Sequence, residues 1–187
     1  MIKYLVYSGI IVWLFPPIRQ FRTSKFYFFL ILALMDPIAL IYGEIFRTSI
    51  TFNYYLIGNY LLLASLAWEK KSSEIRYSLV VAGIFFTILL FTINFSTNDH
   101  LFIAVILQII LLLILLKTFI VEYAFNSNFN LFYLVLVFYV LTIISKFLIV
   151  LLDLANASAF FHITTIAQIL FGLFFSIYKE GKSGKTV

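Results

Sequence analysis

A few ionisable and hydrogen-bonding side chains interrupt an otherwise apolar sequence, and they are the candidates for chemistry. Asp36 precedes Pro37 within an apolar run, Lys146 lies among isoleucine, leucine and phenylalanine, and His162 opens a series of polar residues near the end of the chain. Carboxylate, ammonium and imidazole groups can together bind a small polar or anionic ligand, or a proton. These residues are therefore the starting point for a functional hypothesis.

Their spacing places several of them on shared helix faces. Separations of three, four and seven residues return to one side of an α-helix. Lys146 then shares a face with Tyr139 and Thr142, and Tyr55 shares one with Asn59. A polar stripe near the end of the chain consists of His162, Thr165, Gln168, Gly172 and Ser176.

Structural explanations for the same residues stay open. Asp36 shares its face with Ala33, Ala39 and Gly43, which is typical of a closely packed helix contact around a hydrogen-bonded carboxyl group. Lys146 could form a structural ion pair with a nearby aspartate. The polar stripe could serve only hydrogen bonds between helices.

The composition indicates the solvent in which these residues lie. Of 187 residues, 64% are hydrophobic and 11% are charged, and the mean hydropathy is +1.09. A soluble domain is about 45–50% apolar and about 25% charged. Because this chain has too few polar groups to cover a globule in water, we expect a lipid bilayer around it.

The composition also excludes several classes of site. The chain has no cysteine, which removes disulfides, thiolate nucleophiles and cysteine-ligated metals. His100 and His162 lie far apart in sequence, so neither a metal nor another cofactor is expected. The net charge of +5 comes from short basic clusters between apolar runs, which argues against a nucleic-acid partner.

Seven apolar runs have the length and character of membrane-spanning helices, which need about 20 mostly apolar residues. They cover roughly 3–18, 26–46, 51–68, 77–95, 100–121, 131–153 and 157–178, and Pro16 and Pro17 interrupt the first. The sequence therefore predicts an all-α, polytopic seven-helix bundle over 1–178, followed by a basic cytoplasmic tail over 179–187.

The positions of lysine and arginine predict the orientation, because cytoplasmic connectors collect them. Three clusters fall on one side of a seven-helix chain: Arg19, Arg22 and Lys25; Lys70, Lys71 and Arg76; Lys179, Lys182 and Lys185. We therefore expect the amino terminus outside and the carboxyl terminus in the cytoplasm. A residue usage rich in Ile, Phe, Asn and Lys further suggests a bacterial inner membrane.

These expectations combine into a hypothesis of a sensory or interaction module, not an enzyme. Its outward-facing ligand pocket would be lined by Asp36, Tyr55, Asn59, Lys146, His162, Thr165 and Gln168. The ligand would be small and polar or anionic. Because only short connectors separate the runs, the signal would pass to a separate cytoplasmic signalling protein or through a homo-oligomer.

A small-solute carrier is the alternative. Two groups of three helices joined by a fourth run that has few polar residues, a 3+1+3 arrangement, are similar in architecture to the SWEET and PQ-loop carriers. That resemblance implies a membrane transporter built from two parallel repeats. The sequence departs from it because Pro16, Pro17 and Pro37 all lie in the first half and no Pro-Gln pair occurs. A structural subunit of a larger complex is a third possibility.

Overall fold

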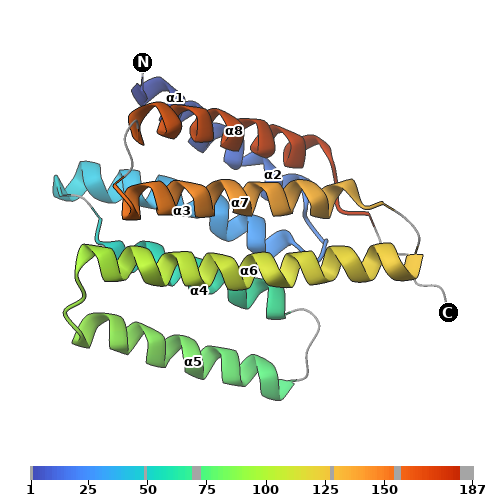
Figure 1. Cartoon of the computed structure of the whole chain (residues 1–187), viewed down its shortest axis with the longest axis horizontal. Helices are drawn as coiled ribbons and strands as arrows, with labels where there is room; N and C mark the ends of the chain where they lie inside the picture. The colour runs from blue at the N-terminus through green and yellow to red at the C-terminus, as the bar shows by residue number, and fades with distance from the viewer. Residues whose placement is uncertain (1, 49, 69–72, 127–128, 154–156, 182–187) are drawn as a thin grey trace.

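The computed structural model describes residues 2–48, 50–68, 73–126, 129–153 and 157–181, and this part of the chain is all-α (Figure 1). The helices are α1 (Ile2–Trp13), α2 (Phe15–Arg19), α3 (Phe26–Phe46), α4 (Phe52–Trp68), α5 (Ser73–Thr92), α6 (Thr97–Asn126), α7 (Leu131–Leu151) and α8 (Ala157–Ile177). They coincide with the seven predicted runs, of which the first is divided between α1 and α2.

Among the described helices, five are long and apolar enough to cross a membrane, namely α3, α5, α6, α7 and α8. The α4 helix, with 17 residues, and the apolar segment Tyr4–Arg19 are shorter. Backbone groups in lipid must satisfy their own hydrogen bonds, and long apolar helices do so. The protein is therefore an integral membrane protein. A count of seven crossings and the orientation remain predictions.

The break between α1 and α2 follows from two prolines. Pro16 and Pro17 are the second and third residues of α2, where a missing backbone N–H costs nothing because the first turn has no helical acceptor for it. The same residues cannot continue α1, which ends at Trp13. The interruption predicted from the sequence is confirmed.

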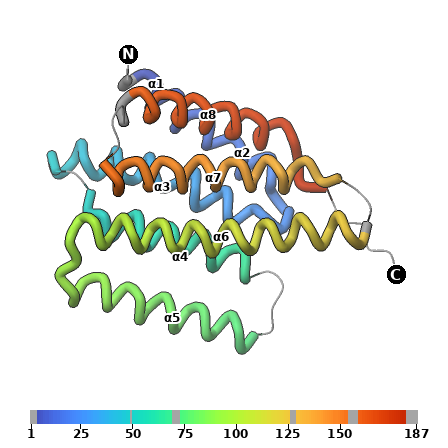
Figure 2. The backbone as a smooth tube through the Cα atoms, in the orientation of Figure 1, coloured from blue at the N-terminus to red at the C-terminus, as the bar shows by residue number. Residues whose placement is uncertain are grey.

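Six helical segments form a ring in which the neighbours are α1, α8, α7, α6, α4 and α3 in turn, and α1 and α2 close the ring onto α3 (Figure 2). The α5 helix lies outside it: among the described helices its backbone approaches only α4, and its Leu90 shares a small apolar cluster with Leu56 of α4 and Ala104 of α6. The two expected groups of three helices are in contact with each other, because α1 packs mainly on α8 and α4 packs on α6. The 3+1+3 arrangement stays a prediction. The peripheral place of the fourth run is confirmed.

Close packing of α1 on α8 depends on Gly172. A Cβ atom there would lie 2.8 Å from Val12 Cγ1 and 3.3 Å from the Trp13 ring. Small residues let two membrane helices approach each other in this way. This contact joins the first and last helices, and it is one reason why the two halves do not separate.

Aromatic side chains fill the interior of the ring. The Trp13 and Tyr139 rings are 4.8 Å apart, and Phe175 lies 4.9 Å from Phe29 and 5.3 Å from Phe132, centroid to centroid. All five side chains are buried. Tilted and edge-on ring pairs of this kind stabilise a core beyond the area they bury.

The α6 helix begins with a capping box that fixes its start. The Ser96 hydroxyl accepts from Asp99 N at 3.2 Å, and the Asp99 carboxylate accepts from Ser96 N at 2.9 Å. One residue later, His100 Nε2 lies 2.7 Å from Asn53 Oδ1 of α4. The cap therefore sets the register in which α6 runs alongside α4.

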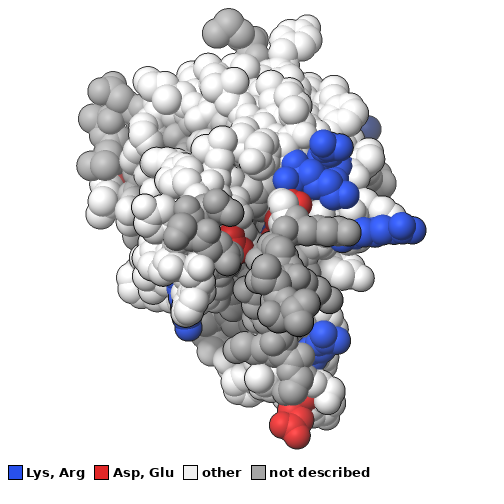
Figure 3. All heavy atoms as spheres, turned by 90° about the vertical axis from the view of Figure 1, so that its right-hand side faces the viewer, with Lys and Arg blue, Asp and Glu red and all other residues white. Residues whose placement is uncertain are grey.

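The bundle has one basic end. Here lie the α2–α3 connection, the start of α5 and the segment after α8, and lysine and arginine side chains gather on this face (Figure 3). The basic residues described there include Arg19, Arg22, Arg76 and Lys179; Lys70, Lys71, Lys182 and Lys185 lie outside the described residues. We call this the basic end, and the end with the α3–α4, α5–α6 and α7–α8 connections the opposite end.

Candidate functional site

Charged and hydroxyl side chains from three helices converge between the centre of the bundle and its opposite end. Asp36 of α3 interacts electrostatically with Lys146 of α7, and with the hydroxyl groups of Tyr54, Tyr55 and Tyr139. No direct ion pair of 4.0 Å or less joins Asp36 to Lys146. Asp36 is exposed, Tyr55 and Lys146 are half-buried, and Tyr139 is buried. We call Asp36, Tyr55, Tyr139 and Lys146 the α3–α7 polar cluster.

The α8 helix contributes an aromatic face to this cluster. Lys146 Nζ lies 4.2 Å from the centroid of the Phe161 ring, which is cation–π geometry. The ammonium group therefore has an aromatic ring on one helix and a carboxylate on another. Three helices, α3, α7 and α8, meet at Lys146.

The backbone beside Asp36 is tied to α4. The Tyr54 hydroxyl donates to the Met35 carbonyl oxygen at 2.9 Å. Pro37, inside α3, has no N–H to donate to the preceding turn. The α3 backbone around Asp36 is thus held by a side chain of α4, which fixes where the carboxylate lies.

The remaining residues of the predicted pocket have varied surroundings. The His162 ring is 6.5 Å from that of Phe161, centroid to centroid. The Thr165 hydroxyl donates to the Phe161 carbonyl oxygen at 2.7 Å, within α8. His162 and Gln168 are half-buried, and their side chains form no hydrogen bond with another described residue. Asp36, Tyr55 and Lys146 are the members of the predicted set that come together most clearly.

Asn59 has a different partner. Gln108 Nε2 of α6 donates to Asn59 Oδ1 at 2.9 Å, and the two side chains are 2% and 5% exposed. Asn59 Nδ2 and Gln108 Oε1 have no hydrogen-bond partner among the described residues. Buried amides normally satisfy both groups, so this pair joins α4 to α6 and retains one unused donor and one unused acceptor.

A second polar network lies at the basic end, and the sequence analysis missed it. The Glu180 carboxylate accepts from the Ser24 hydroxyl at 2.6 and 2.8 Å and from the Tyr133 hydroxyl at 2.6 Å. Lys25 Nζ lies 3.9 Å from the same carboxylate, and both side chains are less than a tenth exposed. We call Ser24, Lys25, Tyr133 and Glu180 the Glu180 network.

Gln20 completes this end by capping α8. Its Nε2 donates to the carbonyl oxygens of Phe175 and Tyr178 at 3.2 and 2.8 Å, and its Oε1 accepts from Glu180 N at 3.0 Å. The side chain is fully buried. The last carbonyl groups of a helix have no helical hydrogen-bond donor. The Gln20 amide, from the amino-terminal part of the chain, provides that donor at the end of α8.

Two sequence signals could have pointed to this network. Glu180 is an acidic residue within a basic carboxyl-terminal segment, and Gln20 and Ser24 lie between basic residues of the first connector. The two segments were used only to predict the orientation, for which lysine and arginine alone are counted. Ser24 and Glu180 are 156 residues apart in the chain, and Tyr133 and Glu180 are 47 apart, so spacing alone gives no indication that they meet.

The aromatic core lies between the α3–α7 polar cluster and the Glu180 network. Tyr139 belongs to both the core and the polar cluster, and Phe132 of the core is the neighbour of Tyr133 in the network. No family model, curated protein or solved structure matches the chain.

Proposed function

We propose that this protein is a membrane-embedded sensory module that binds a small polar or anionic ligand between Asp36 and Lys146. The observation that carries the proposal is that Lys146 Nζ lies 4.2 Å from the Phe161 ring centroid, while no ion pair of 4.0 Å or less joins it to Asp36, the carboxylate whose charge acts on it. An ionised side chain at the centre of a spanning helix costs roughly 2.5–3.5 kcal/mol. A ligand with complementary polar groups that lies between the two side chains would reduce this cost for both.

The chemistry around Lys146 suits a carboxylate or another small anionic group. Its ammonium group supplies up to three donors, and the Phe161 ring at 4.2 Å holds it from one side. Asp36 and the Tyr55 hydroxyl could then bind a cationic or hydroxyl group of the same molecule. A small zwitterion or hydroxy acid fits this pattern best.

The same three helices that meet at Lys146 also meet at the basic end. The α3 helix begins after Ser24 and Lys25, α7 carries Tyr133 in its first turn, and Glu180 follows α8. A ligand that draws α3 and α7 together would therefore alter the packing on which the Glu180 network depends. We propose that a partner protein binds at the basic end and responds to this change in packing.

A carrier is the alternative, and the aromatic core argues against it. Transport requires a path that alternately opens to each side. Between the polar cluster and the basic end, the interior is filled by buried rings of Trp13, Phe29, Phe132, Tyr139 and Phe175. A sensor needs no such path, which is why we prefer that function.

Thermal unfolding of the purified chain in nanodiscs tests the proposal, with glycine, glutamate and lactate as probes. A ligand at about 100 times its Kd stabilises the folded state by about 2.7 kcal/mol. We expect a saturable increase in Tm with at least one probe. The increase should vanish in Asp36→Asn and in Lys146→Gln, but persist in Glu44→Gln, which removes an exposed charge from the same helix α3.

Two outcomes would contradict the proposal. A Tm increase that survives both site variants would place binding elsewhere. Uptake of the stabilising probe into proteoliposomes, lost in Asp36→Asn, would favour the carrier instead. In the sensory case the same vesicles show no uptake.

A further inference from the structure

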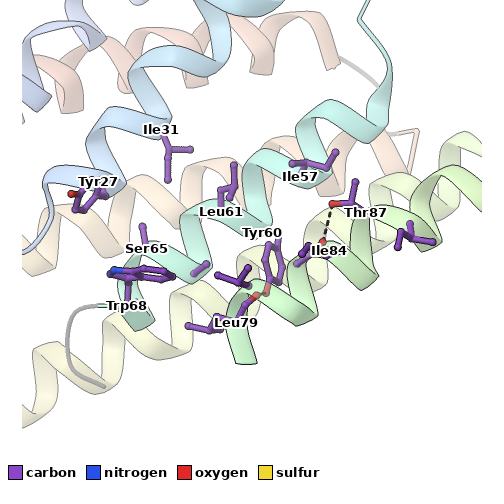
Figure 4. A pocket seen from close by; sticks show the side chains of 14 residues that line it. Tyr27, Ile31, Ile57, Tyr60, Leu61, Ser65, Trp68, Leu79, Ile84 and Thr87 are labelled. Atoms are coloured by element: carbon purple, nitrogen blue, oxygen red, sulfur yellow. Dashed lines mark hydrogen bonds between the residues drawn. The ribbon is translucent and has the colours of Figure 1, made fainter. Parts of the chain in front are cut away.

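A groove of about 670 Å³ runs between α3, α4 and α5 (Figure 4), and none of its lining residues belongs to the α3–α7 polar cluster. Tyr27 and Ile31 line it from α3, Tyr60 and Leu61 from α4, and Ile84 from α5. Its volume lies within the range of about 300–1,000 Å³ that is usual for ligand pockets. It opens outward from the bundle, where lipid would surround the protein.

The groove exists because α5 touches α4 but not α3. The Tyr60 hydroxyl donates to the Leu79 carbonyl oxygen at 2.6 Å, and its ring stacks on Phe86 at 5.5 Å. A Cβ atom at Gly83 would lie 2.7 Å from the Tyr60 ring, so the glycine lets α5 approach α4 at this point. The described parts of α3 and α5 do not contact each other, and the space between them is the groove.

The walls of the groove suit a hydrocarbon chain better than a polar molecule. The hydroxyl groups of Tyr60, Ser65 and Thr87 donate to backbone carbonyl oxygens at 2.6, 2.7 and 2.8 Å, so their protons are not available to a ligand. The other lining side chains are mainly aliphatic or aromatic. The interior of the groove therefore has few hydrogen-bonding groups for a sugar or an amino acid.

Trp68 lines the groove at the end nearest the basic end, and Arg76 lies beside Trp68. Arg76 Nε donates to the Trp68 carbonyl oxygen at 3.0 Å, and its guanidinium group lies 5.8 Å from the Trp68 ring centroid. Tyr27 lies on the α3 side of the groove (Figure 4). Arg76 is exposed, and four of its five N–H donors remain for an anion.

We propose that this groove is a binding site for a phospholipid with an anionic headgroup. An acyl chain lies in the groove, and the phosphate is held by Arg76 beside Trp68. Interfacial aromatic residues and basic side chains on the cytoplasmic side are the usual partners of such headgroups. The site is separate from the α3–α7 polar cluster and does not depend on its ligand.

Native mass spectrometry of the full chain, released from detergent with added lipid, tests this proposal. The probes are phosphatidylglycerol and phosphatidylcholine with identical acyl chains. We expect one phosphatidylglycerol to be retained in preference to phosphatidylcholine. Arg76→Gln should weaken retention of phosphatidylglycerol about fivefold, the usual effect of one basic residue near a lipid headgroup, and leave phosphatidylcholine unchanged. Arg47→Gln, the same substitution at the opposite end, should change neither.

Two substitutions test the groove itself. Ala64→Phe fills it from α4 and Ile84→Trp fills it from α5, so one informative variant remains if the other does not fold. Either change should abolish retention of both lipids in a chain with an unchanged helical circular dichroism spectrum. Retention that ignores both substitutions, or equal retention of the two lipids with no effect of Arg76→Gln, would overturn the proposal. A lipid-free dimer that Ile84→Trp dissociates would show that a second copy occupies the groove instead.

Discussion

The ammonium group of Lys146 on α7 lies over the ring of Phe161 on α8, 4.2 Å from its centroid. This contact positions Lys146. The oppositely charged Asp36 of α3 interacts with it electrostatically but forms no direct ion pair. The cation is therefore positioned by an aromatic neighbour and keeps its hydrogen-bonding capacity. A structural ion pair would have used that capacity.

The contact between Lys146 and Phe161 should appear in a double-mutant cycle. We expect Phe161→Leu to destabilise the chain more in the natural background than in Lys146→Met, with a coupling energy of about 1 kcal/mol. Unfolding in mixed detergent micelles measures the four free energies. Phe160→Leu, one position away on α8, provides the control and should show no coupling with Lys146.

The buried amide pair of α4 and α6 should also be coupled. Asn59→Leu or Gln108→Leu alone leaves the other amide buried without its partner, at a cost of about 1–2 kcal/mol. The double variant removes both polar groups and should lose less than the sum of the two single losses. Strictly additive losses of unfolding free energy would show that the 2.9 Å hydrogen bond contributes nothing.

Gln20 should be essential for the end of α8. Gln20→Met keeps the length of the side chain but removes three hydrogen bonds, so we expect a loss of about 2–3 kcal/mol in the free energy of unfolding. Gln20→Glu should lose more, because a carboxylate oxygen would face the two carbonyl oxygens that the amide now serves. An unfolding free energy that Gln20→Met leaves unchanged would refute the capping role.

Two glycines at the α1–α8 interface should respond to alanine in opposite directions. Gly172→Ala places a Cβ atom 2.8 Å from Val12 Cγ1, and we expect it to destabilise the chain by about 1 kcal/mol or more. At Gly9 the new atom would be 3.8 Å from Ile169, an ordinary contact. Gly9→Ala should therefore stabilise α1 by about 0.5–1 kcal/mol through helix propensity. Equal thermal shifts would show that Gly172 is not tightly packed.

The helices could be predicted from the sequence because their signal is local. Runs of apolar residues and the Pro16-Pro17 interruption predict where helices lie, and the structure confirms this. The bounds differ for α5, which covers Ser73–Thr92 and not 77–95, and for α6, which covers Thr97–Asn126 and not 100–121. The 3+1+3 arrangement could not be derived from such local signals, since the order of helices in the chain does not say which of them pack together. The contact at Gly172 joins α1 to α8 and opposes a separation of the two halves.

The candidate site was predictable only in part, for a related reason. Helical periodicity gives the face of each helix but not the partner toward which that face turns. Asp36, Tyr55 and Lys146 turn toward a common region, whereas Asn59 turns toward Gln108. The Glu180 network joins positions up to 156 residues apart, and no periodic pattern connects them.

Labelling of single cysteines tests the central claim most directly, because the natural chain has no cysteine to interfere. The claim is that Asp36 and Lys146 face a shared polar space that water and a ligand can enter from the opposite end of the bundle. In proteoliposomes, a membrane-impermeant maleimide should modify Asp36→Cys and Lys146→Cys from that side. Ile38→Cys is exposed on the same helix α3 and should stay unmodified, since its side chain faces lipid. Failure of the reagent to modify position 36, or equal modification of positions 36 and 38, would contradict the account.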